Sequence, residues 1–341
     1  MTIVASHSKL ARSAAMQEAV RGLEQAIASG GGVLLCGEPG TGRELLARVI
    51  HLAREIRGRS IERLLRLSMQ ESTHSNGRPF VVIDCTATPN LELRLFGTAA
   101  GMAANGSDFD RIAGGSALHQ AIGGTLLLRQ LAEVPAGAQR RLARVLREHE
   151  VWLDTNGHEK LVQVDLRPIA TLDGGGDEDG IIPELRKRLA KCSIEAPPLR
   201  RRREDIPALV RYLLVDLCAS LNVTRKTASN QAMELLAALP WRGNLMELRE
   251  LLRNLVVMIP GRLIRVEDVL ANIRFDGNPI VFLYGGSLKQ ARERFERDYV
   301  AHVLRQHHGR VSEAARVLGI QRTNLYRKLR KLAVPSPRRG T

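Results

Sequence analysis

The chain has 341 residues, of which 44% are hydrophobic and 26% charged, so it can bury a core of ordinary size in two or three domains. No apolar stretch approaches the length of a membrane span, and the N-terminal segment lacks the compact apolar core of a signal peptide. Cys36, Cys85, Cys192 and Cys218 are far apart, which argues against a zinc site or a disulfide framework. We expect a soluble cytoplasmic protein without a metal centre.

Basic residues are in excess and are concentrated near the C-terminus. The chain has 51 Lys and Arg against 36 Asp and Glu, a formal net charge of +15. Residues 287–341 alone contain 14 basic and 4 acidic residues, a net charge of +10. Positive charge concentrated in this way indicates a nucleic-acid partner, although a solvated basic surface would give the same count.

The first predicted elements surround a glycine-rich loop. Met16, Val20, Leu23 and Ile27 recur at helical spacing, and a buried strand follows over 33–36. The string GEPGTGRE then leads into an amphipathic helix, which is the strand–turn–helix context of a nucleotide phosphate loop. Arg43 replaces the usual lysine of such loops by a broader cation. An ordinary glycine turn is the alternative. The candidate nucleotide-binding residues are Gly37, Glu38, Pro39, Gly40, Thr41, Gly42, Arg43 and Glu44.

The elements that follow alternate between strands and helices, which predicts a mostly parallel sheet covered on both faces. Residues 57–77 are basic and polar with weak periodicity, so we predict a surface insertion there. Pro168 lacks a backbone donor and is awkward in a central strand. The predicted elements are a strand over 80–84, a strand over 124–128, a helix over 139–148, a strand over 162–171, a short strand over 192–194 and a helical region over 205–273.

The basic C-terminal segment has the pattern of a helix-turn-helix unit. Leu288, Ala291, Phe295, Tyr299 and Val303 form one apolar stripe on a long predicted helix. The third predicted helix spans 321–332, with Leu325, Leu329 and Leu332 facing inward. Its outward residues are predicted to enter a major groove of double-stranded DNA. We expect base contacts from Arg322, Thr323, Asn324 and Arg327, and phosphate contacts from Lys328, Arg330 and Lys331.

Six strings carry a resemblance to one family: GEPGTGRE at Gly37, RPFVVIDC at Arg78, LFG at Leu95, GGTLLL at Gly123, PPLRRRREDIP at Pro197 and WRGNLMEL at Trp241. Residues 13–273 resemble the AAA+ domain of bacterial sigma-54 enhancer-binding proteins, and the remainder resembles their Fis-type DNA-binding domain. The resemblance implies an α/β fold with a P-loop parallel sheet sandwiched by helices, a helical lid and an all-α helix-turn-helix domain. The implied divisions are 1–200 for the AAA+ α/β subdomain, 201–275 for the lid, 276–287 for a linker and 288–341 for the DNA-binding domain.

Several positions depart from the family pattern. The family's Asp-Glu pair, which holds magnesium and polarises water, is Arg129 and Gln130 here. A cation on the ligand position excludes magnesium, which requires oxygen ligands. The resemblance also assigns an asparagine to the position of Asp84 and a phosphate-sensing arginine to that of Met246. We therefore expect that this chain does not hydrolyse ATP.

The resemblance includes arginines that reach into a neighbouring subunit's site. Arg188 aligns with one of them, whereas the other aligns with Ile182. In a chain without hydrolysis, Arg188 is expected to be a surface ion-pair residue rather than a functional finger. The family's sigma-54 contact loop aligns with residues 101–106, where Ala103 and Ala104 replace its aromatic residue and threonine. Alanine cannot supply a buried aromatic anchor, so we expect no remodelling of sigma-54 polymerase.

These observations predict a sequence-specific transcription regulator that neither hydrolyses ATP nor engages sigma-54. It would form a homodimer through its C-terminal domain, which is paired in Fis-type proteins, and higher or hetero-oligomers through the AAA+ domain; contact with RNA polymerase is left open. No cofactor is required, although Arg43 and Arg129 together are candidates for neutralising ATP or another nucleotide without metal. The alternatives are a nucleotide-sensing regulator and an ATP-dependent sigma-54 activator with a rearranged site. No receiver-like segment precedes Ser13, so control by abundance, a nucleotide or a partner is expected.

Overall fold

The computed structural model describes residues 11–56, 59–69, 77–97, 109–155, 157–174, 180–275 and 278–279, then isolated helical positions between 300 and 315, and residues 322–331. The chain divides into two compact units, Met1–Ile280 and Val281–Thr341. The division at 280 lies inside the segment 276–287 that the sequence suggests as a linker. The strands Arg274–Phe275 (β11) and Asn278–Pro279 (β12) pair antiparallel, so part of that segment forms a small hairpin.

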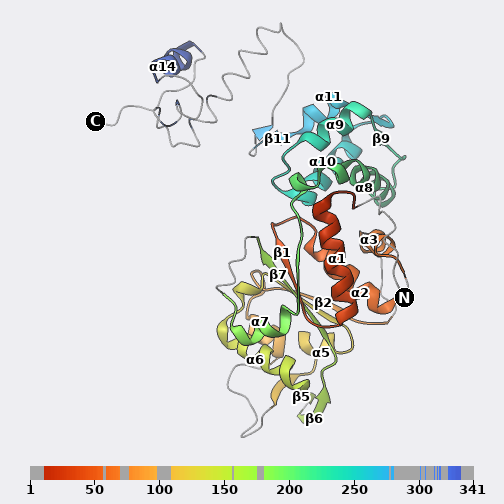
Figure 1. Cartoon of the computed structure of the whole chain (residues 1–341), viewed down its shortest axis with the longest axis vertical. Helices are drawn as coiled ribbons and strands as arrows, with labels where there is room; N and C mark the ends of the chain where they lie inside the picture. Colours follow the sequence, from red (N-terminus) through yellow and green to blue (C-terminus); the bar gives the residue numbers. More distant parts are fainter. Residues whose placement is uncertain are drawn as a thin grey trace. The chain divides into compact units, whose positions relative to one another are not determined.

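The first unit contains an α/β body followed by a helical lid (Figure 1). The helices of the α/β body are α1 Ala14–Ser29, α2 Arg43–Glu55, α3 Ile61–Met69, α4 Leu91–Phe96, α5 Ala117–Ala121, α6 Ala136–Glu148 and α7 Pro183–Leu189, with a 3₁₀ turn η1 at Leu131–Glu133. Its strands are β1 Val33–Gly37, β2 Phe80–Asp84, β3 Asp110–Ala113, β4 Thr125–Arg129, β5 Glu150–Thr155, β6 His158–Gln163, β7 Arg167–Asp173 and β8 Cys192–Glu195.

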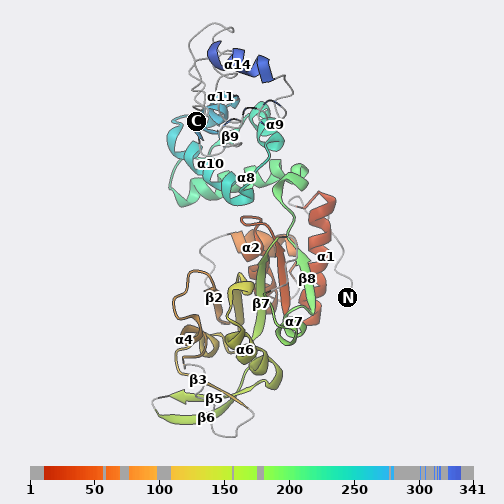
Figure 2. The same cartoon turned by 90° about the vertical axis from the view of Figure 1, so that its left-hand side faces the viewer.

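Within the described residues, five strands form a parallel sheet in the order β2-β4-β7-β1-β8. The register aligns Gly37 with Asp173 and Asp84 with Arg129, so the carboxyl ends of β1, β7, β4 and β2 meet at one edge. We call this the carboxyl edge. Strands β3, β5 and β6 form a second, smaller sheet at one end of the α/β body (Figure 2).

Two hydrophobic cores cover the two faces of the parallel sheet, because successive strand residues point to opposite faces. Val33 and Leu35 of β1 pack with α1, α2 and α3, whereas Leu34 packs with the helices α4 to α7. The predicted α/β class, with the sheet sandwiched between helices, is confirmed. The rigid sheet fixes the carboxyl edge on which the candidate site lies.

Two predictions about local structure were wrong. The segment predicted as a surface insertion contains α3, whose Ile61, Leu64 and Leu65 are buried in the core beside α2. These residues have helical spacing, but the charged outer face of the helix weakens the pattern. The strand predicted over 162–171 is divided between β6 and β7.

Pro168 lies in β7, a central strand, despite its missing backbone donor. The pairing of β7 with β4 includes Pro168, whereas the pairing of β7 with β1 begins only at Ile169. The backbone N–H of Arg167 donates to the carbonyl of Gly124, beside β4. Because alternate strand residues direct their N–H groups to opposite neighbours, the N–H that proline lacks would point beyond the start of the β1 pairing.

The lid is helical, as predicted. Its elements are the 3₁₀ turns η2 Leu199–Arg201 and η3 Arg203–Asp205, helices α8 Ile206–Ser220, α9 Asn230–Ala238, α10 Asn244–Met258 and α11 Val266–Asn272, and the strands β9 Thr227–Ala228 and β10 Leu263–Ile264. A separate hydrophobic core joins these helices, with Trp241 buried in it. The buried carboxylate of Asp205 accepts hydrogen bonds from the backbone of Arg12 and Ser13, which ties the lid to the start of α1.

The second unit has its own small core of Val300, Leu304, Val311, Ala315, Leu325 and Leu329. Leu325 and Leu329 belong to α14, Arg322–Lys331, and are buried as predicted. The predicted stripe from Leu288 to Val303, and Leu332, lie outside the described residues.

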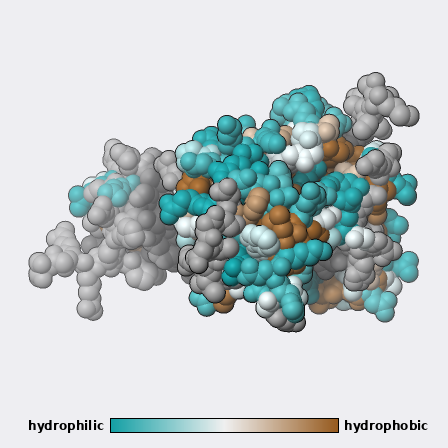
Figure 3. Space-filling view, turned by 90° about the horizontal axis from the view of Figure 1, so that it is seen from below, coloured by the Kyte–Doolittle hydropathy of each residue, from teal (hydrophilic) through white to brown (hydrophobic). Residues whose placement is uncertain are grey.

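One face of the described part of the protein is mainly polar. Figure 3 shows a face on which hydrophilic side chains predominate and hydrophobic ones form small patches. No helix among the described residues is long and apolar enough to cross a membrane.

Candidate functional site

The glycine-rich loop connects β1 to α2 at the carboxyl edge. Gly37, Gly40 and Gly42 have positive φ angles of 144°, 76° and 100°, and Gly42 is the N-cap of α2. A Cβ atom at Gly40 would collide with the carbonyl of Gly243 in the lid, so the close approach also requires glycine. The loop leads directly into the N-terminus of a 13-residue helix, which is the backbone arrangement that binds phosphate.

The lid holds this loop through backbone contacts. The N–H of Leu245 donates to the carbonyl of Gly40 at 2.9 Å, and the Asn244 amide donates to the carbonyl of Pro39 at 2.9 Å. The buried Arg202 guanidinium donates to the carbonyl of Thr41 at 2.8 Å. Three consecutive loop carbonyls therefore have lid partners, and a movement of the lid is mechanically coupled to the loop.

Glu38 adds an ionic contact between loop and lid. The guanidinium of Arg200 donates to both oxygens of Glu38, with one nitrogen–oxygen distance of 2.7 Å. The Asn244 amide donates to the same carboxylate at 3.2 Å. The hydrogen bond from Arg200, followed by that from Asn244, lowers the pKa of Glu38 from 4.5 to about 2 in spite of partial burial.

Arg43, predicted to face phosphate, is paired with a carboxylate of its own chain. Its guanidinium lies 2.6 Å from a carboxylate oxygen of Asp173 at the end of β7, and it also donates to the carbonyl of Leu172. Only 11% of the Arg43 side chain is exposed. The guanidinium of Arg43 therefore packs against the end of β7.

Arg129 and Gln130, at the end of β4, are also paired. Arg129 lies 3.5 Å from Asp84, its neighbour in the sheet register, and the Gln130 amide donates to Asp173 at 2.8 Å. Gln130 has a left-handed backbone with φ of 57°. We call Arg43, Asp84, Arg129, Gln130 and Asp173 the edge brace, because their contacts join the loop, β2, β4 and β7.

The two carboxylates of the edge brace do not fit a magnesium site. Asp173 accepts from Arg43 and Gln130, and Asp84 faces Arg129. The pKa of Asp84 is lowered mainly by a hydrogen bond from the Thr86 hydroxyl, with smaller contributions from backbone N–H groups and the charge of Arg129. The part of the chain that the structure describes contains no cluster of three or more His, Cys, Asp or Glu residues able to hold a metal. The loop suits phosphate, whereas its surroundings do not suit the divalent ion that usually accompanies it.

Helix α14 carries the predicted DNA-contacting residues. Arg322, Thr323 and Arg327 are exposed, Asn324 is half-buried, and Leu325 and Leu329 point into the core. Arg327 donates to the side-chain oxygen of Asn324 at 3.3 Å, so these two residues lie together on the outer face. Lys328, Arg330 and Lys331 belong to the same helix, but their side chains lie outside the described part of the structure.

Comparisons with known proteins agree with this arrangement. Models of the sigma-54 interaction domain, the AAA+ ATPase lid domain and the bacterial regulatory proteins of the Fis family match residues 10–178, 200–279 and 291–332 respectively. The chain belongs to the sigma-54 enhancer-binding protein family. The nitrogen assimilation regulatory protein NtrX of Azorhizobium caulinodans is 31% identical over 347 residues, covering 96% of this chain and 69% of that protein. The transcriptional regulatory protein ZraR of Klebsiella oxytoca is 32% identical over 335 residues, covering 96% and 70%.

Solved structures of a family member show the same fold. The crystal structure of NtrX from Brucella abortus in complex with ADP has a TM-score of 0.57 and 28% identity, covering 95% of this chain and 69% of that chain. The structure of the same protein in complex with ATP has a TM-score of 0.55, with 28% identity over 95% and 68% of the two chains. This enhancer-binding protein is therefore a transcription regulator with an AAA+ domain and a Fis-type helix-turn-helix domain.

The remaining family positions are spread over the enhancer-binding protein. Met246 lies on α10 beside the loop, with 69% of its surface exposed. Ile182 precedes α7 and is held by a hydrogen bond from its N–H to Gln139. Arg188 lines a cavity beside Gly30–Gly32, which precede β1, so within one chain it is not brought to the loop that follows β1. It has no carboxylate partner among the described residues, so the predicted surface ion pair is absent there. Residues 101–106 lie outside the described ranges.

The sequence analysis missed four side chains of the site. Asp173, Arg200, Arg202 and Asn244 each contact the loop or the edge brace. Asp173 could have been found, because it ends a strand and the carboxyl ends of parallel strands share one edge. Arg200, Arg202 and Asn244 lie within the strings PPLRRRREDIP and WRGNLMEL, but their contacts with the loop depend on how the lid packs and could not be read from those strings.

Proposed function

We propose that this enhancer-binding protein regulates transcription through sequence-specific DNA binding, and that its AAA+ unit is an oligomerisation platform without ATP hydrolysis. The edge brace is the observation that carries the proposal. A hydrolytic site needs oxygen ligands for magnesium and a base for the attacking water, but here the end of β4 supplies a guanidinium and an amide. The fold is intact around this change, as expected for a unit kept for assembly.

The brace also explains how the altered site remains stable. Arg43, Arg129 and Gln130 each have a carboxylate partner, so the substituted polar groups satisfy one another. A phosphate entering the loop would compete with Asp173 for Arg43. We therefore expect any nucleotide to bind weakly and without a requirement for magnesium.

We propose the same divisions of the chain that the family resemblance implies. Residues 1–200 would form the α/β subdomain, 201–275 the lid, 276–287 the linker and 288–341 the DNA-binding domain. Three separate hydrophobic clusters in the first unit and one in the second support this division. Homodimers through the second unit, and larger or mixed assemblies through the AAA+ unit, are part of the same proposal.

A second candidate function is ATP-dependent activation of sigma-54 polymerase, which the relatives favour, since NtrX from Brucella abortus has been crystallised with ATP and with ADP. The full chain should be assayed for phosphate release from ATP with magnesium and with a chelator. The matched control is Gly42→Asp, which adds a carboxylate at the mouth of the loop, with its fold checked by circular dichroism. We expect equal release in all samples. Magnesium-dependent phosphate release that is abolished in Gly42→Asp would establish that the chain hydrolyses ATP. It would overturn the proposal that the AAA+ unit is a platform without hydrolysis.

The same samples distinguish a third candidate, a nucleotide-sensing regulator. Titration with fluorescent ATP and ADP, with and without magnesium, measures binding separately from hydrolysis. Tight binding that is independent of magnesium, lost in Gly42→Asp and accompanied by a change in DNA affinity would favour the sensor.

DNA binding is tested by mapping bound sites across the genome and noting any adjacent sigma-54 promoters. On a mapped site, Arg327→Ala should weaken binding by about 10-fold or more, consistent with about 1–3 kcal/mol for a base contact. Arg253→Ala, an exposed arginine of the lid, is the matched control. Affinity should also fall steeply with salt, because each neutralised phosphate releases roughly one counterion. If neither Arg327→Ala nor added salt changed the DNA affinity, α14 would not be the helix that contacts the bases.

A further inference from the structure

The cavity that Arg188 lines is at the opposite end of the parallel sheet from the phosphate loop. Its volume is about 450 Å³, and it is bounded by Gly30–Gly32 before β1, the end of α6, the β6–β7 connection and the end of α7. Leu146, Leu166 and Pro168 form its apolar floor. None of these residues belongs to the edge brace, so the cavity is a separate feature of the α/β body.

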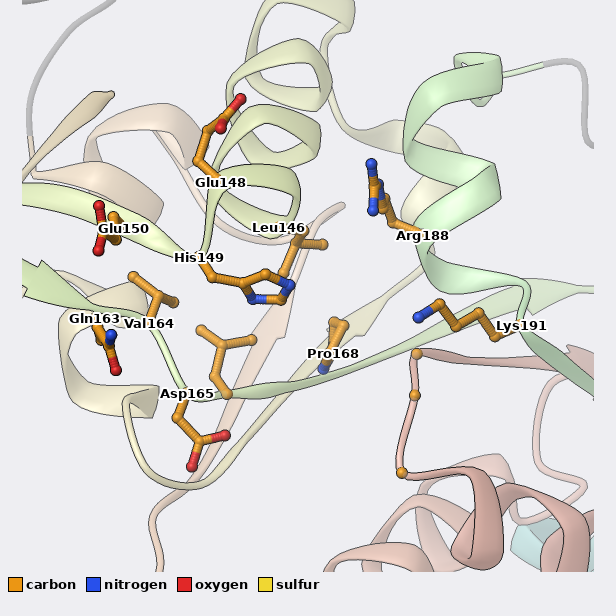
Figure 4. A pocket seen from close by; sticks show the side chains of 14 residues that line it. Leu146, Glu148, His149, Glu150, Gln163, Val164, Asp165, Pro168, Arg188 and Lys191 are labelled. Atoms are coloured by element: carbon orange, nitrogen blue, oxygen red, sulfur yellow. The ribbon is translucent and has the colours of Figure 1, made fainter. Parts of the chain in front are cut away.

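Three nitrogen-bearing side chains converge on this cavity. Figure 4 shows Arg188 and Lys191 pointing from the α7 side toward His149, whose ring points back toward them from the end of α6. Glu148, Glu150 and Asp165 also line the cavity, but Figure 4 shows their carboxylates directed away from the space between α6 and α7.

The charges around the cavity are unevenly paired. Asp165 lies 3.7 Å from Arg54, and Glu148 lies 2.6 Å from Arg147, so both carboxylates have cations of their own. Among the described residues, neither Arg188 nor Lys191 has a carboxylate within ion-pair distance. Glu150, a third carboxylate of the lining, also has no cation within ion-pair distance among the described residues, but Figure 4 shows it on the far side of His149 from Arg188 and Lys191. The α7 side of the cavity therefore carries two cations without a paired carboxylate, beside an imidazole.

The backbone holds these groups in position. A Cβ atom at Gly31 would lie 2.7 Å from Cδ of Lys191, and one at Gly32 would collide with the carbonyl of Arg188. The glycines thus let the end of α7 approach the start of β1. His149 is the C-cap of α6 in the left-handed conformation, with φ of 56°. This conformation costs a non-glycine residue about 1 kcal/mol, and such strain is found preferentially at functional positions.

We propose that this cavity binds a small phosphorylated metabolite, with its phosphate held by Arg188, Lys191 and His149. A guanidinium donates two parallel hydrogen bonds to phosphate oxygens, and an ammonium adds a point charge, which together suit a dianion. The cavity is larger than one phosphate group, so the apolar floor and the Gln163 amide accommodate an organic part such as a sugar. The binding is independent of the phosphate loop.

Two simpler roles for these cations make different predictions. Cations at the end of a helix stabilise its negative end, so a purely structural role predicts lower stability on their removal without any change in phosphate binding. A role for Arg188 at a neighbouring subunit's nucleotide predicts that any phosphate effect depends on the phosphate loop and on self-association.

The test is isothermal titration of the full chain with inorganic phosphate, glycerol phosphate, hexose phosphate and the free hexose. We expect saturable binding of a phosphorylated probe and none of the free hexose. Lys191→Ala, which alters an exposed residue, and Arg188→Ala should each weaken binding by about 10-fold, as expected for the loss of one charge-assisted contact. Arg188→Lys should restore part of the affinity lost in Arg188→Ala.

Two matched controls complete the design. Lys187→Ala removes a cation from the same helix outside the cavity, and Gly42→Asp disables the phosphate loop; both should bind the probe as the unaltered chain does. Absence of saturable binding up to about 10 mM of every phosphorylated probe would overturn the proposal. Binding that is unchanged in both Arg188→Ala and Lys191→Ala, or lost in Gly42→Asp, would also overturn it. Because Gly42→Asp separates the two sites, failure here leaves the proposed platform function unaffected.

Discussion

Replacing Asp173 by alanine removes the carboxylate at the centre of the edge brace. The substitution deletes the 2.6 Å ion pair to Arg43 and the 2.8 Å hydrogen bond from Gln130. Arg43 keeps its contact with the carbonyl of Leu172, but its guanidinium loses its counter-charge on a side chain that is only 11% exposed. The folded state should therefore be destabilised.

The magnitude follows from the exposure of the two partners. Hydrogen bonds to charged groups contribute about 1.5–3 kcal/mol when buried, whereas exposed ion pairs contribute about 0.2–1 kcal/mol. Asp173 is 46% exposed, so water replaces part of what is lost. We expect Asp173→Ala to lower the free energy of unfolding by about 1–2 kcal/mol. In a double-mutant cycle, Arg43→Ala and Asp173→Ala should show a coupling energy of about 1 kcal/mol.

The assay is urea unfolding followed by the fluorescence of the two tryptophans, Trp152 on β5 and Trp241 in the lid. The matched control is a cycle on Glu195 and Arg201, an ion pair whose side chains are mostly exposed. Its coupling energy should be about 0.3 kcal/mol or less. If Arg43 and Asp173 coupled no more strongly than this control pair, the edge brace would not be an energetic unit and the argument from it would fail.

Three further predictions concern other parts of the molecule. The pKa of Glu38 is about 2 in the folded protein and 4.5 in the reference state. The contribution of the ionised carboxylate to the free energy of unfolding is therefore complete above pH 4.5 and is lost as the pH falls toward 2. In Glu38→Gln, the free energy of unfolding measured in urea should vary with pH by about 1 kcal/mol less across that window than in the unaltered chain; the effect is modest because solvent screens this half-exposed pair. An unchanged pH dependence would contradict the contact with Arg200. Leu64→Ala should lower the free energy of unfolding by about 2–5 kcal/mol. A change below about 0.5 kcal/mol would indicate that α3 lies on the surface, as the sequence analysis predicted. His149→Gly should relieve about 0.5–1 kcal/mol of backbone strain and so raise the midpoint of thermal unfolding. A midpoint that does not rise would argue against the left-handed conformation at residue 149.

The parallel sheet and the loop were predictable because their signals are local. Buried strands such as β1 and β4 are short apolar runs, and the glycine spacing of the loop reflects positive φ angles that other residues rarely adopt. The inward leucines of α14 follow from helical periodicity in the same way. The outline of the family fold is therefore present in contiguous segments of sequence.

The contacts within the site were not predictable, because they join segments far apart in the chain. Arg43 and Asp173 are separated by 130 positions, and Glu38 and Arg200 by 162. The sequence identified Arg43 as a cation near phosphate, but only the register of β1 with β7 shows which carboxylate it meets. The helix α3 was missed for a different reason: its apolar face is narrow, and charged residues on the outer face dominate the composition of the segment.

The network of contacts also constrains how hydrolysis could be regained. A carboxylate at position 129 would face Asp84 in the sheet register, and one at 130 would face Asp173, so reversal of either substitution alone brings like charges together. Like charges at that separation raise carboxylate pKa values and cost stability unless a divalent ion binds between them. Arg43 would still hold Asp173, and Met246 would still supply no charge from the lid. The altered residues therefore support one another, and the structure favours keeping the whole set over changing any one of them.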